Sequence, residues 1–281
     1  MDQTILDAFN QYFKMVPACS DELRREVYKL RFQVYCNETL FEDPLQHPGE
    51  IEYDEYDSNS IHYLIRHRRS NTYAATTRLI LPSALDGEKL FPIEVHSTID
   101  NLELLKDLPR NKIAEVSRFC VSKKKTFPIE VNTTIDNVEA LKDVPRNKLS
   151  EVSRFCVSKE FKRREYDKSD SLTGINEEYV EKIAEQERRT FPHITLALIA
   201  CLIRASEEND IDYWLAVMEP ALQRFLATLG IHFKDIGPII EYHGKRQPCI
   251  IKVSDLLNGV FQKKPHLWGM LTNKGHYGGA F

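Results

Sequence analysis

The chain has 281 residues, of which 42% are hydrophobic and 28% charged, and its formal net charge at pH 7 is −4. This length is enough for one large α/β domain with its own core. The negative net charge gives no overall basic field of the kind that nucleic-acid-binding proteins use. No apolar run approaches the ~20 residues of a membrane span, and the N-terminus lacks the basic start of a secretory signal.

Six cysteines are present, and none belongs to a Cys-x-x-Cys pair. A cysteine inside an apolar strand or helix behaves as a small hydrophobic residue. We therefore expect a reduced, cytoplasmic protein without a metal site.

The N-terminal third is predicted to form two helices, a loop and a β-hairpin. Apolar residues recur at helical spacing in the first segment, and Ser20 is a suitable N-cap for the second helix. Acidic residues, Pro44, Pro48 and Gly49 then predict a loop. The expected elements are helices over 4–16 and 20–36, a loop over 37–60 and strands over 61–68 and 73–82.

The remainder alternates between strands and helices. Pro220 suits the first turn of a helix that ends at Gly230, and Ser254 is positioned to cap a short closing helix. The segment after Lys263 is rich in glycine and is expected to be a loosely ordered tail. The other expected elements are strands over 113–121, 149–157 and 213–218, a weak helix over 176–188, an apolar helix over 193–208, and a hairpin over 232–243 and 248–253.

One stretch of the sequence occurs twice. Residues 91–123 read FPIEVHSTIDNLELLKDLPRNKIAEVSRFCVSK, and residues 127–159 read FPIEVNTTIDNVEALKDVPRNKLSEVSRFCVSK, 36 positions later. Two copies are too few for a solenoid. The sequence therefore predicts a tandem duplication, over 91–126 and 127–162, inside a fold that needs one copy.

Arginines and acidic residues recur in an order that suggests a site. Arg31 and Tyr35 are four residues apart and share a helix face. Asp54 and Asp57 lie in the acidic loop, where they can meet arginines. Arg78 interrupts an apolar strand, where an unpaired charge is costly. A Glu-x-x-Arg motif then occurs in each repeat copy, as Glu115 with Arg118 and as Glu151 with Arg154.

This order resembles the acyl-homoserine-lactone synthases, with Phe41 standing where that family usually has Trp. The strings RFQVYCNETLFE, YDEYDSNSIHYL, TRLILP, EVSRFCVSK, MEPALQRFLATLGIHF and IGPIIEYHGKRQPC are similar to the PEP-CTERM/exosortase-associated acyltransferases. Both resemblances imply a GNAT-type fold, with a mixed twisted sheet and helices on both faces. They imply one acyltransferase domain over 1–262 and a tail over 263–281.

The GNAT pyrophosphate loop is missing from its expected place. Glycines there would let backbone N–H groups approach a pyrophosphate, but the chain reads KEFKRREYDKSD. Its basic cluster, which comprises Lys159, Lys162, Arg163 and Arg164, is a possible docking site for an acidic carrier protein or a phosphopantetheine phosphate. The same cluster would also be compatible with a solvated charge run on a loop.

The two resemblances imply transfer of an acyl group from an acyl carrier protein or CoA thioester to the amine of a small substrate, expected to be an amino acid. Arg31, Arg78 and Arg154 would bind its carboxylate, with Tyr35, Phe41, Asp54 and Asp57 completing the substrate site. No permanently bound cofactor is expected. Two alternatives stay open: a lactone synthase that uses S-adenosylmethionine, and a non-catalytic acyl- or carrier-binding module.

Glu151 is expected to be the general base and Arg154 its neighbour on the central strand. Because the two are three residues apart, a β-bulge between them would be needed to bring both to one face. The second copy runs directly into the segment that follows that strand. We therefore expect residues 91–126 to form an extra loop or edge element, with Glu115 and Arg118 outside the site. The reverse arrangement stays open because the copies are nearly identical.

Overall fold

A computed structural model describes residues 5–83, 89–100, 105–122, 192–241 and 244–278. These residues form one mixed β-sheet in the order β1-β2-β3-β4-β5-β8-β6. The short strand β7 pairs with the first residues of β8. Within the described part of the chain, β4 and β5 are parallel and the other neighbouring strands are antiparallel. The strands are β1 Phe13–Pro17, β2 Ser60–His67, β3 Tyr73–Ile80, β4 Ile113–Val121, β5 Tyr213–Met218, β6 Lys234–Asp235, β7 Ile240–Glu241 and β8 Lys245–Lys252.

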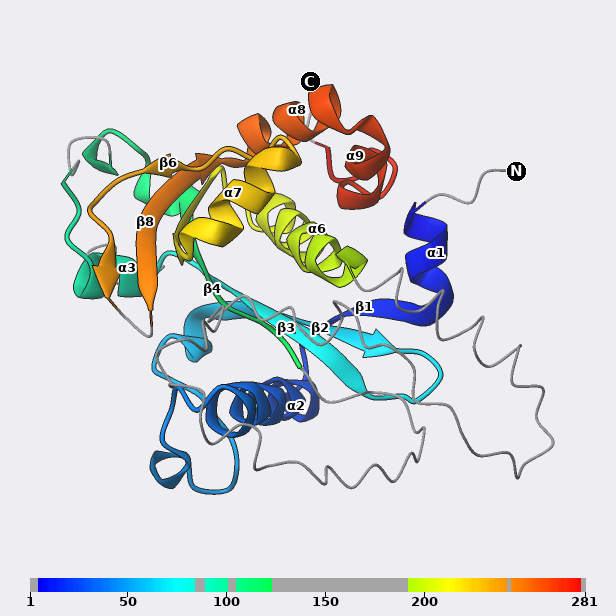
Figure 1. Cartoon of the computed structure of the whole chain (residues 1–281), viewed down its shortest axis with the longest axis vertical. Coiled ribbons are helices and arrows are strands. Elements are labelled where there is room, and N and C mark those ends of the chain that lie inside the picture. Colours follow the sequence, from blue (N-terminus) through cyan, green and yellow to red (C-terminus); the bar gives the residue numbers. More distant parts are fainter. Residues whose placement is uncertain (1–4, 84–88, 101–104, 123–191, 242–243, 279–281) are drawn as a thin grey trace, which may run out of the picture.

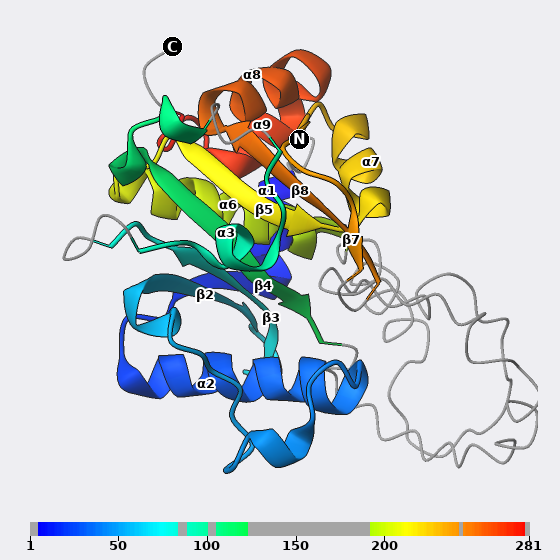
Figure 2. The same cartoon turned by 90° about the vertical axis from the view of Figure 1, so that its left-hand side faces the viewer.

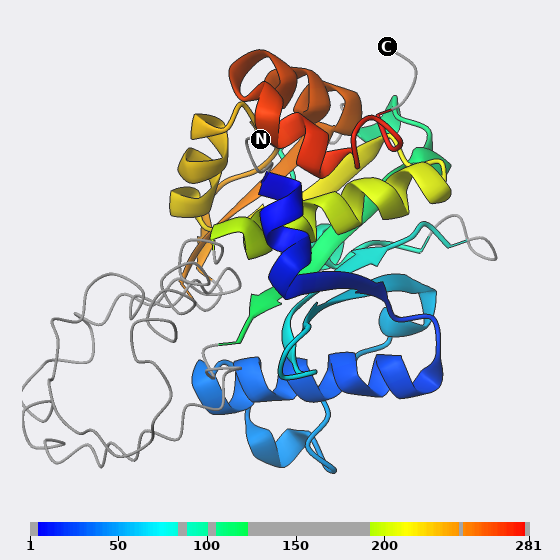
Figure 3. The ribbon, with the colours of Figure 1, turned by 90° about the vertical axis from the view of Figure 1, so that its right-hand side faces the viewer.

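Helices cover both faces of the sheet, as the sequence predicted (Figure 1). On one face α6 lies against the central strands, with α7, α8 and α9 beside it and α1 next to α6 and α9 (Figure 3). On the other face α2 covers β2 and β3, while α3 lies over β4 and β5 (Figure 2). The helices are α1 Ile5–Tyr12, α2 Asp21–Phe32, α3 Pro92–His96, α6 Pro192–Glu208, α7 Pro220–Thr228, α8 Val253–Lys263 and α9 Pro265–Leu271.

The second predicted helix begins where expected and ends in an unusual turn. Ser20 is the N-cap of α2, and its hydroxyl accepts a hydrogen bond from the Leu23 N–H at 3.3 Å. The last part of the predicted helix is a π-helix over Gln33–Glu38. Such wider turns recur near functional sites, and this one carries Tyr35.

The first helix is shorter than the sequence predicted. α1 stops at Tyr12, and Phe13–Pro17 forms the edge strand β1, which pairs with β2. Phe13 has helical spacing to Phe9, but its side chain is buried at the start of the strand. Pairing with an existing hairpin therefore overrides the local helical pattern here.

The C-terminal segment is more ordered than expected. Residues after Lys263 form α9 and a closing turn, and Leu267, Met270 and Leu271 are buried in the main core. The described chain thus packs as part of the domain up to residue 278. Ser254 does not cap α8, because that helix already begins at Val253 with Lys252 in the cap position.

Two glycines bring the turn after α7 against α8. A Cβ built on Gly230 would lie 2.2 Å from the Gly259 carbonyl oxygen, and one on Gly259 would lie 2.0 Å from the Gly230 oxygen. Gly230 also has a φ of 93°, which only glycine adopts readily. The two backbones are therefore in direct contact. Among the described residues, no helix is both long enough and apolar enough to span a bilayer.

Candidate active site

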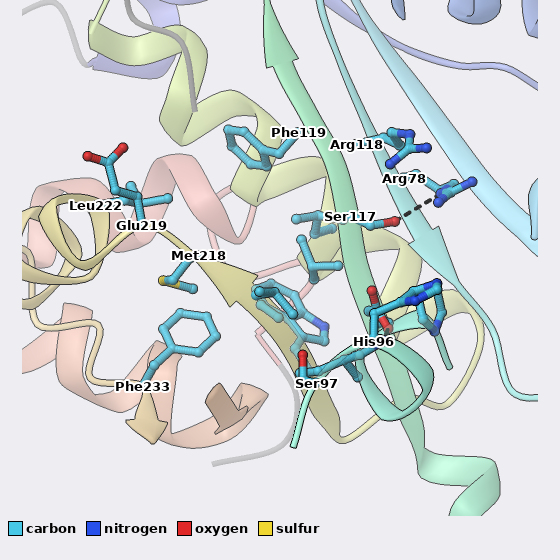
Figure 4. A pocket seen from close by; sticks show the side chains of 18 of the residues that line it. Arg78, His96, Ser97, Ser117, Arg118, Phe119, Met218, Glu219, Leu222 and Phe233 are labelled. Carbon is cyan, nitrogen blue, oxygen red and sulfur yellow. Dashed lines mark hydrogen bonds between the residues drawn. The ribbon is translucent and has the colours of Figure 1, made fainter. Parts of the chain in front are cut away.

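The site begins where two parallel strands separate. β4 and β5 are paired from Ile113 with Tyr213 to Val116 with Ala216. Beyond that pair both strands continue, but no further pairing joins them among the described residues. A cavity of about 390 Å³ opens at the separation, and it is lined by both strands (Figure 4). Backbone groups on the facing edges of the two strands are therefore directed towards the cavity rather than towards a partner strand.

A β-bulge in β4 lies at the same level. Thr76 of β3 pairs with Cys120, whereas Arg78 pairs with Ser117, so one residue of β3 faces two of β4. Arg118 lies in the bulge with a φ of 48°. Positive φ values of non-glycine residues carry strain and often occur at functional sites. A bulge was expected between Glu151 and Arg154 of the second copy; the structure has a bulge in the first copy, where pairing is regular from Glu115 to Ser117 and shifts at Arg118.

Three arginines and three carboxylates form a network beside the bulge. Arg31 pairs with Glu52 and, at 2.6 Å, with Asp57. Arg78 contacts Asp54 as well as Asp57, and Arg118 contacts Glu52 and Asp54. Arg78 Nη1 lies 2.6 Å from Asp54 Oδ1 and 2.8 Å from Asp57 Oδ1, and Arg118 Nη2 lies 2.9 Å from Glu52 Oε1 and 3.2 Å from Asp54 Oδ2. The network balances three guanidinium charges with three carboxylate charges.

Burial makes these charges depend on one another. The side chains of Arg31, Glu52, Asp57 and Arg78 are all at most 5% exposed. Burial alone would raise the pKa of Glu52, but the attraction of Arg31 and Arg118 outweighs it and lowers that pKa to about 2. Burial likewise opposes ionisation of Asp57, and Arg31 with Arg78 nevertheless holds its pKa well below the ordinary value. Both carboxylates are therefore ionised at neutral pH.

His62 of β2 lies next to Asp57 of the network. Its Nε2 is 3.5 Å from Asp57 Oδ1, and its ring is 2% exposed. Burial and then repulsion by Arg31 lower the pKa of His62 to about 4, although Asp57 acts in the opposite direction. His62 is therefore neutral near pH 7.

Tyr35 and Phe41 support the network from the side of the π-helix. The Arg118 guanidinium lies over the Tyr35 ring, 5.6 Å from its centroid. Phe41 packs against the small buried cluster of Val34, Tyr35 and Cys120. Neither aromatic ring lines the cavity, so both act on the site through the residues that they contact.

Glu115 is the buried carboxylate nearest the point where the strands separate. It precedes Val116, the last residue of β4 that pairs with β5, and it lines the cavity. Its Oε2 accepts a hydrogen bond of 2.8 Å from the Ile93 N–H in the first turn of α3. Pro92 suits the start of that helix because it has no N–H to leave unpaired. The short helix α3 therefore holds the carboxylate of Glu115 in place.

The cavity has a polar side and an apolar side. Figure 4 shows Arg78 and Arg118 on one side of β4, and Met218, Leu222 and Phe233 on the other. Asp54 and Glu115 belong to the polar side together with the two arginines. Side chains of α6, α7, α8 and β5 form the apolar side, including Ile199, Leu202, Trp214, Leu226 and Leu256.

The structure brings together most of the predicted substrate-site residues. Asp54 and Arg78 line the cavity, while Arg31, Tyr35, Phe41 and Asp57 lie behind them. Two contributors were missed: Glu52, one of several acidic residues in the same loop, and Ser117, whose hydroxyl accepts a hydrogen bond from Arg78. No group of three or more His, Cys, Asp or Glu side chains in the described residues is arranged to hold a metal ion.

Residues 91–126 were expected to form an outer loop or edge element, and this prediction is wrong. Residues 113–121 form the central strand β4 instead of an outer loop, and Glu115 and Arg118 line the cavity. Glu151, Arg154 and the basic cluster at Lys159, Lys162, Arg163 and Arg164 lie outside the described residues, as do the strand expected over 149–157 and the helix over 176–188.

Two side-chain differences between the copies favour the first copy in the central strand. Loop closure does not decide, because the extra 36 residues lengthen either the connection before the strand or the one after it. Ala114 is fully buried in the core that includes α6, where the second copy has Ser150, which would bury a hydroxyl. Ile113 is also buried, where the second copy has Leu149, which lacks the β-branch that suits strands.

One known protein family matches this chain, and the matched residues include the first repeat copy. Residues 30–126 match the sequence model of the family described as "Acetyltransferase (GNAT) domain". The match runs from the end of α2 through β4, so it contains the network and the first repeat copy and stops before the second. This part of the chain is therefore similar to GNAT domains, and the match supports an acyltransferase of unspecified substrate.

Several solved structures align with most of this chain. TofI, solved in a ternary complex with an inhibitor and MTA, is 12% identical, covers 91% of this chain and 99% of its own, and has a TM-score of 0.49. BjaI, a CoA-dependent acyl-homoserine lactone synthase solved with SAM and isopentyl-CoA, is 14% identical over 94% and 88%, with a TM-score of 0.47. FeeM, an N-acyl amino acid synthase from uncultured soil microbes, is 12% identical over 88% and 93%, with a TM-score of 0.44. No curated protein matches the chain by sequence.

Proposed function

We propose that this protein is an N-acyltransferase that moves an acyl group from a carrier or CoA thioester to the amine of a small substrate, expected to be an amino acid. The observation that carries the proposal is the cavity where β4 and β5 separate, with a charged side and an apolar side. The GNAT domain match over residues 30–126 supports acyl transfer as the reaction class.

The donor would enter with its acyl chain on the apolar side of the cavity. Its thioester carbonyl would then lie beside the bulge, where β4 has no pairing to β5 after Val116. Backbone N–H groups fixed at such a position are suited to stabilise the negative charge that develops on the carbonyl oxygen. This arrangement requires no covalent intermediate with the enzyme.

Glu115 is the proposed general base. The acceptor amine must be neutral to attack, and a carboxylate held by the Ile93 N–H can take its proton directly or through a water molecule. The nitrogen then forms a bond to the carbonyl carbon and the carbon–sulfur bond breaks. The released thiolate takes up a proton, so that an amide and a free thiol are the products.

The two arginines that line the cavity are the proposed partners of the acceptor's carboxylate. Arg78 and Arg118 each keep part of a planar guanidinium on the polar side, and that geometry suits a carboxylate. Arg31 lies behind them and is fully buried, so its proposed role is to fix Glu52 and Asp57. This assigns to Arg31 a positioning role instead of the direct substrate contact expected from the sequence.

The identity of the donor is the finer part of the proposal. An acidic acyl carrier protein would be recruited by the basic cluster at Lys159, Lys162, Arg163 and Arg164, because opposite surface charges steer association. The resemblance to the exosortase-associated acyltransferases is consistent with a long acyl chain and an amino acid acceptor, and that link is likewise a proposal.

The test is a coupled measurement of thiol release and product mass. The full chain is incubated with acyl-carrier and acyl-CoA donors and a panel of amino acids, with S-adenosylmethionine as a separate acceptor. We expect thiol release that depends on an amino acid, and a product with the mass of its N-acyl derivative. A lactone formed only with S-adenosylmethionine would indicate the synthase alternative, and the absence of any thiol release would indicate a binding module.

A further inference from the structure

We propose that Trp214 closes the apolar side of the cavity and thereby sets the longest acyl chain that the protein accepts. This inference rests on the proposed function, because it assumes that the apolar side holds an acyl chain. It concerns a specificity-determining residue and not the chemistry of transfer.

The first argument comes from alternation along β5. Trp214, Ala216 and Met218 are two residues apart in turn, so their side chains share one face of the sheet, and all three line the cavity. Ala216 is opposite Val116, the last residue of β4 that pairs with β5, whereas Trp214 is opposite Ala114, where these two strands are still joined. Along this face Met218 marks the open end, Ala216 the point of separation and Trp214 the closed end.

The second argument comes from α6, which crosses over from β4 to β5 and therefore runs antiparallel to both. Ile199 and Leu202 line the cavity, and Ser206 continues the same face of the helix. Ser206 Oγ accepts a hydrogen bond of 2.7 Å from the Trp214 indole N–H, and both residues are at most 2% exposed. The bond joins the helix to the strand at the closed end, so the space between them ends at the indole ring.

The walls next to this ring are fixed as well. Leu226 and Ile231 line the cavity from the side of α7, and Leu256 lines it from α8. The direct contact of Gly230 with Gly259 fixes these two elements relative to each other. An acyl chain that reaches Trp214 therefore meets the largest side chain of the apolar side, one that is held by a hydrogen bond. Additional methylenes would have to displace it.

The prediction is a chain-length limit that moves with the size of residue 214. Each additional methylene that is buried increases the binding affinity of the acyl chain about fourfold, until the chain meets the end of the cavity. Trp214→Leu and Trp214→Ala should move the limit to longer chains, with a change on the order of tenfold in preference for a donor one step beyond the wild-type limit. Trp214→Phe should give a smaller change, because most of the ring remains.

The experiment uses two readouts on the full chain. Dissociation constants are measured for saturated fatty acids of increasing even length, and product lengths are measured in the acyl-transfer assay with a matching donor series. Met218→Ala is the matched control, because it enlarges the open end of the same face and should leave the length limit where it is. Circular dichroism and thermal melting check that each variant folds, and Trp214→Phe keeps the test possible where the alanine variant does not fold.

The outcomes separate this inference from the proposed function. A limit that moves in the Trp214 variants and not in Met218→Ala supports the inference. The same limit in every folded variant, or fatty-acid binding that does not depend on length, overturns it. A limit that moves in binding while no donor is turned over would support the role of Trp214 and overturn the proposed acyl transfer.

Discussion

The Arg78 side chain joins the ion-pair network to the bulge of β4, because its Nε donates a hydrogen bond of 2.9 Å to Ser117 Oγ. The same guanidinium contacts Asp54 and Asp57 through Nη1. Ser117 is the residue at which the bulge begins. The charge pattern of the polar side and the backbone geometry beside the proposed thioester position are therefore connected through one side chain.

Arg31→Ala should lower the free energy of unfolding, because Arg31 has a structural role. The change leaves Glu52 and Asp57 buried without their shared partner, which is expected to cost ~3–5 kcal/mol of unfolding free energy. Urea denaturation measures this loss. Arg24→Ala on the exposed side of α2 is the control, because its pair with Asp21 is 3.8 Å long and solvent-exposed. Equal losses in the two variants would contradict the structural role assigned to Arg31.

Glu115→Gln should remove acyl transfer while leaving the fold intact. The amide can still accept the Ile93 hydrogen bond but cannot take a proton, so kcat is expected to fall by about 10²–10⁴-fold. Glu94→Gln is the control on α3, because that carboxylate binds Arg110 and does not line the cavity. Glu151→Gln should also keep activity. If Glu151→Gln is the inactive variant, the second copy supplies the base, and if both stay active the base is not this glutamate.

Ala114→Ser tests why the first copy occupies the central strand. It places in β4 the residue that the second copy carries, and a hydroxyl buried in that apolar core is expected to cost ~1–3 kcal/mol of unfolding free energy. Chemical denaturation at a fixed pH measures the difference. Ser150→Ala is the reciprocal change and should leave the unfolding free energy unchanged. A neutral Ala114→Ser would mean that this position does not discriminate between the copies.

His62 should make the protein less stable in mild acid. Its pKa is about 4 in the folded protein against 6.5 as the ordinary value, so between these pH values the unfolded chain binds a proton that the folded chain does not. Its contribution is complete above pH ~6.5 and falls by about 2 kcal/mol on reaching pH 5. His62→Gln should therefore lose less stability than the wild type between pH 7 and pH 5. A His62→Gln curve that follows the wild-type curve would contradict the prediction.

Charge reversal of Lys159, Lys162, Arg163 and Arg164 should weaken donor recruitment. The KM for an acyl carrier protein is expected to rise more than kcat falls, because the cluster acts on association. The effect should shrink as salt concentration increases. Reversal of Arg24 and Arg25 on the exposed side of α2 is the control. An unchanged KM at low salt would remove this role from the cluster.

The sequence predicted the elements with strong local patterns. The hairpin of β2 and β3, the apolar helix α6 and the buried strand β5 all lie within two residues of their expected bounds. Arg78 and Asp54 were found because a charge within an apolar strand requires a partner. Glu52 could not be separated from the other acidic residues of its loop, since only the fold decides which of them turns inward.

Other features depend on contacts between distant segments. The strand at Phe13–Pro17 forms because β2 offers an edge to pair with, and no local pattern contains that information. The burial of Ala114 against α6 favours the first repeat copy in β4, and the sequence of either copy alone does not reveal that burial. The contact between Gly230 and Gly259 likewise joins segments that are distant in the sequence, and no local pattern predicts it.

The contact between Gly230 and Gly259 limits how this protein can diversify. Because neither position can gain a Cβ without separating α8 from the turn after α7, the frame around the apolar side has little freedom to widen or narrow. Relatives that handle other acyl groups would therefore be expected to keep both glycines and to differ in the side chains that project from this frame, such as Ile231 and Leu256. Substrate range would then evolve by exchange of single residues on a constant backbone.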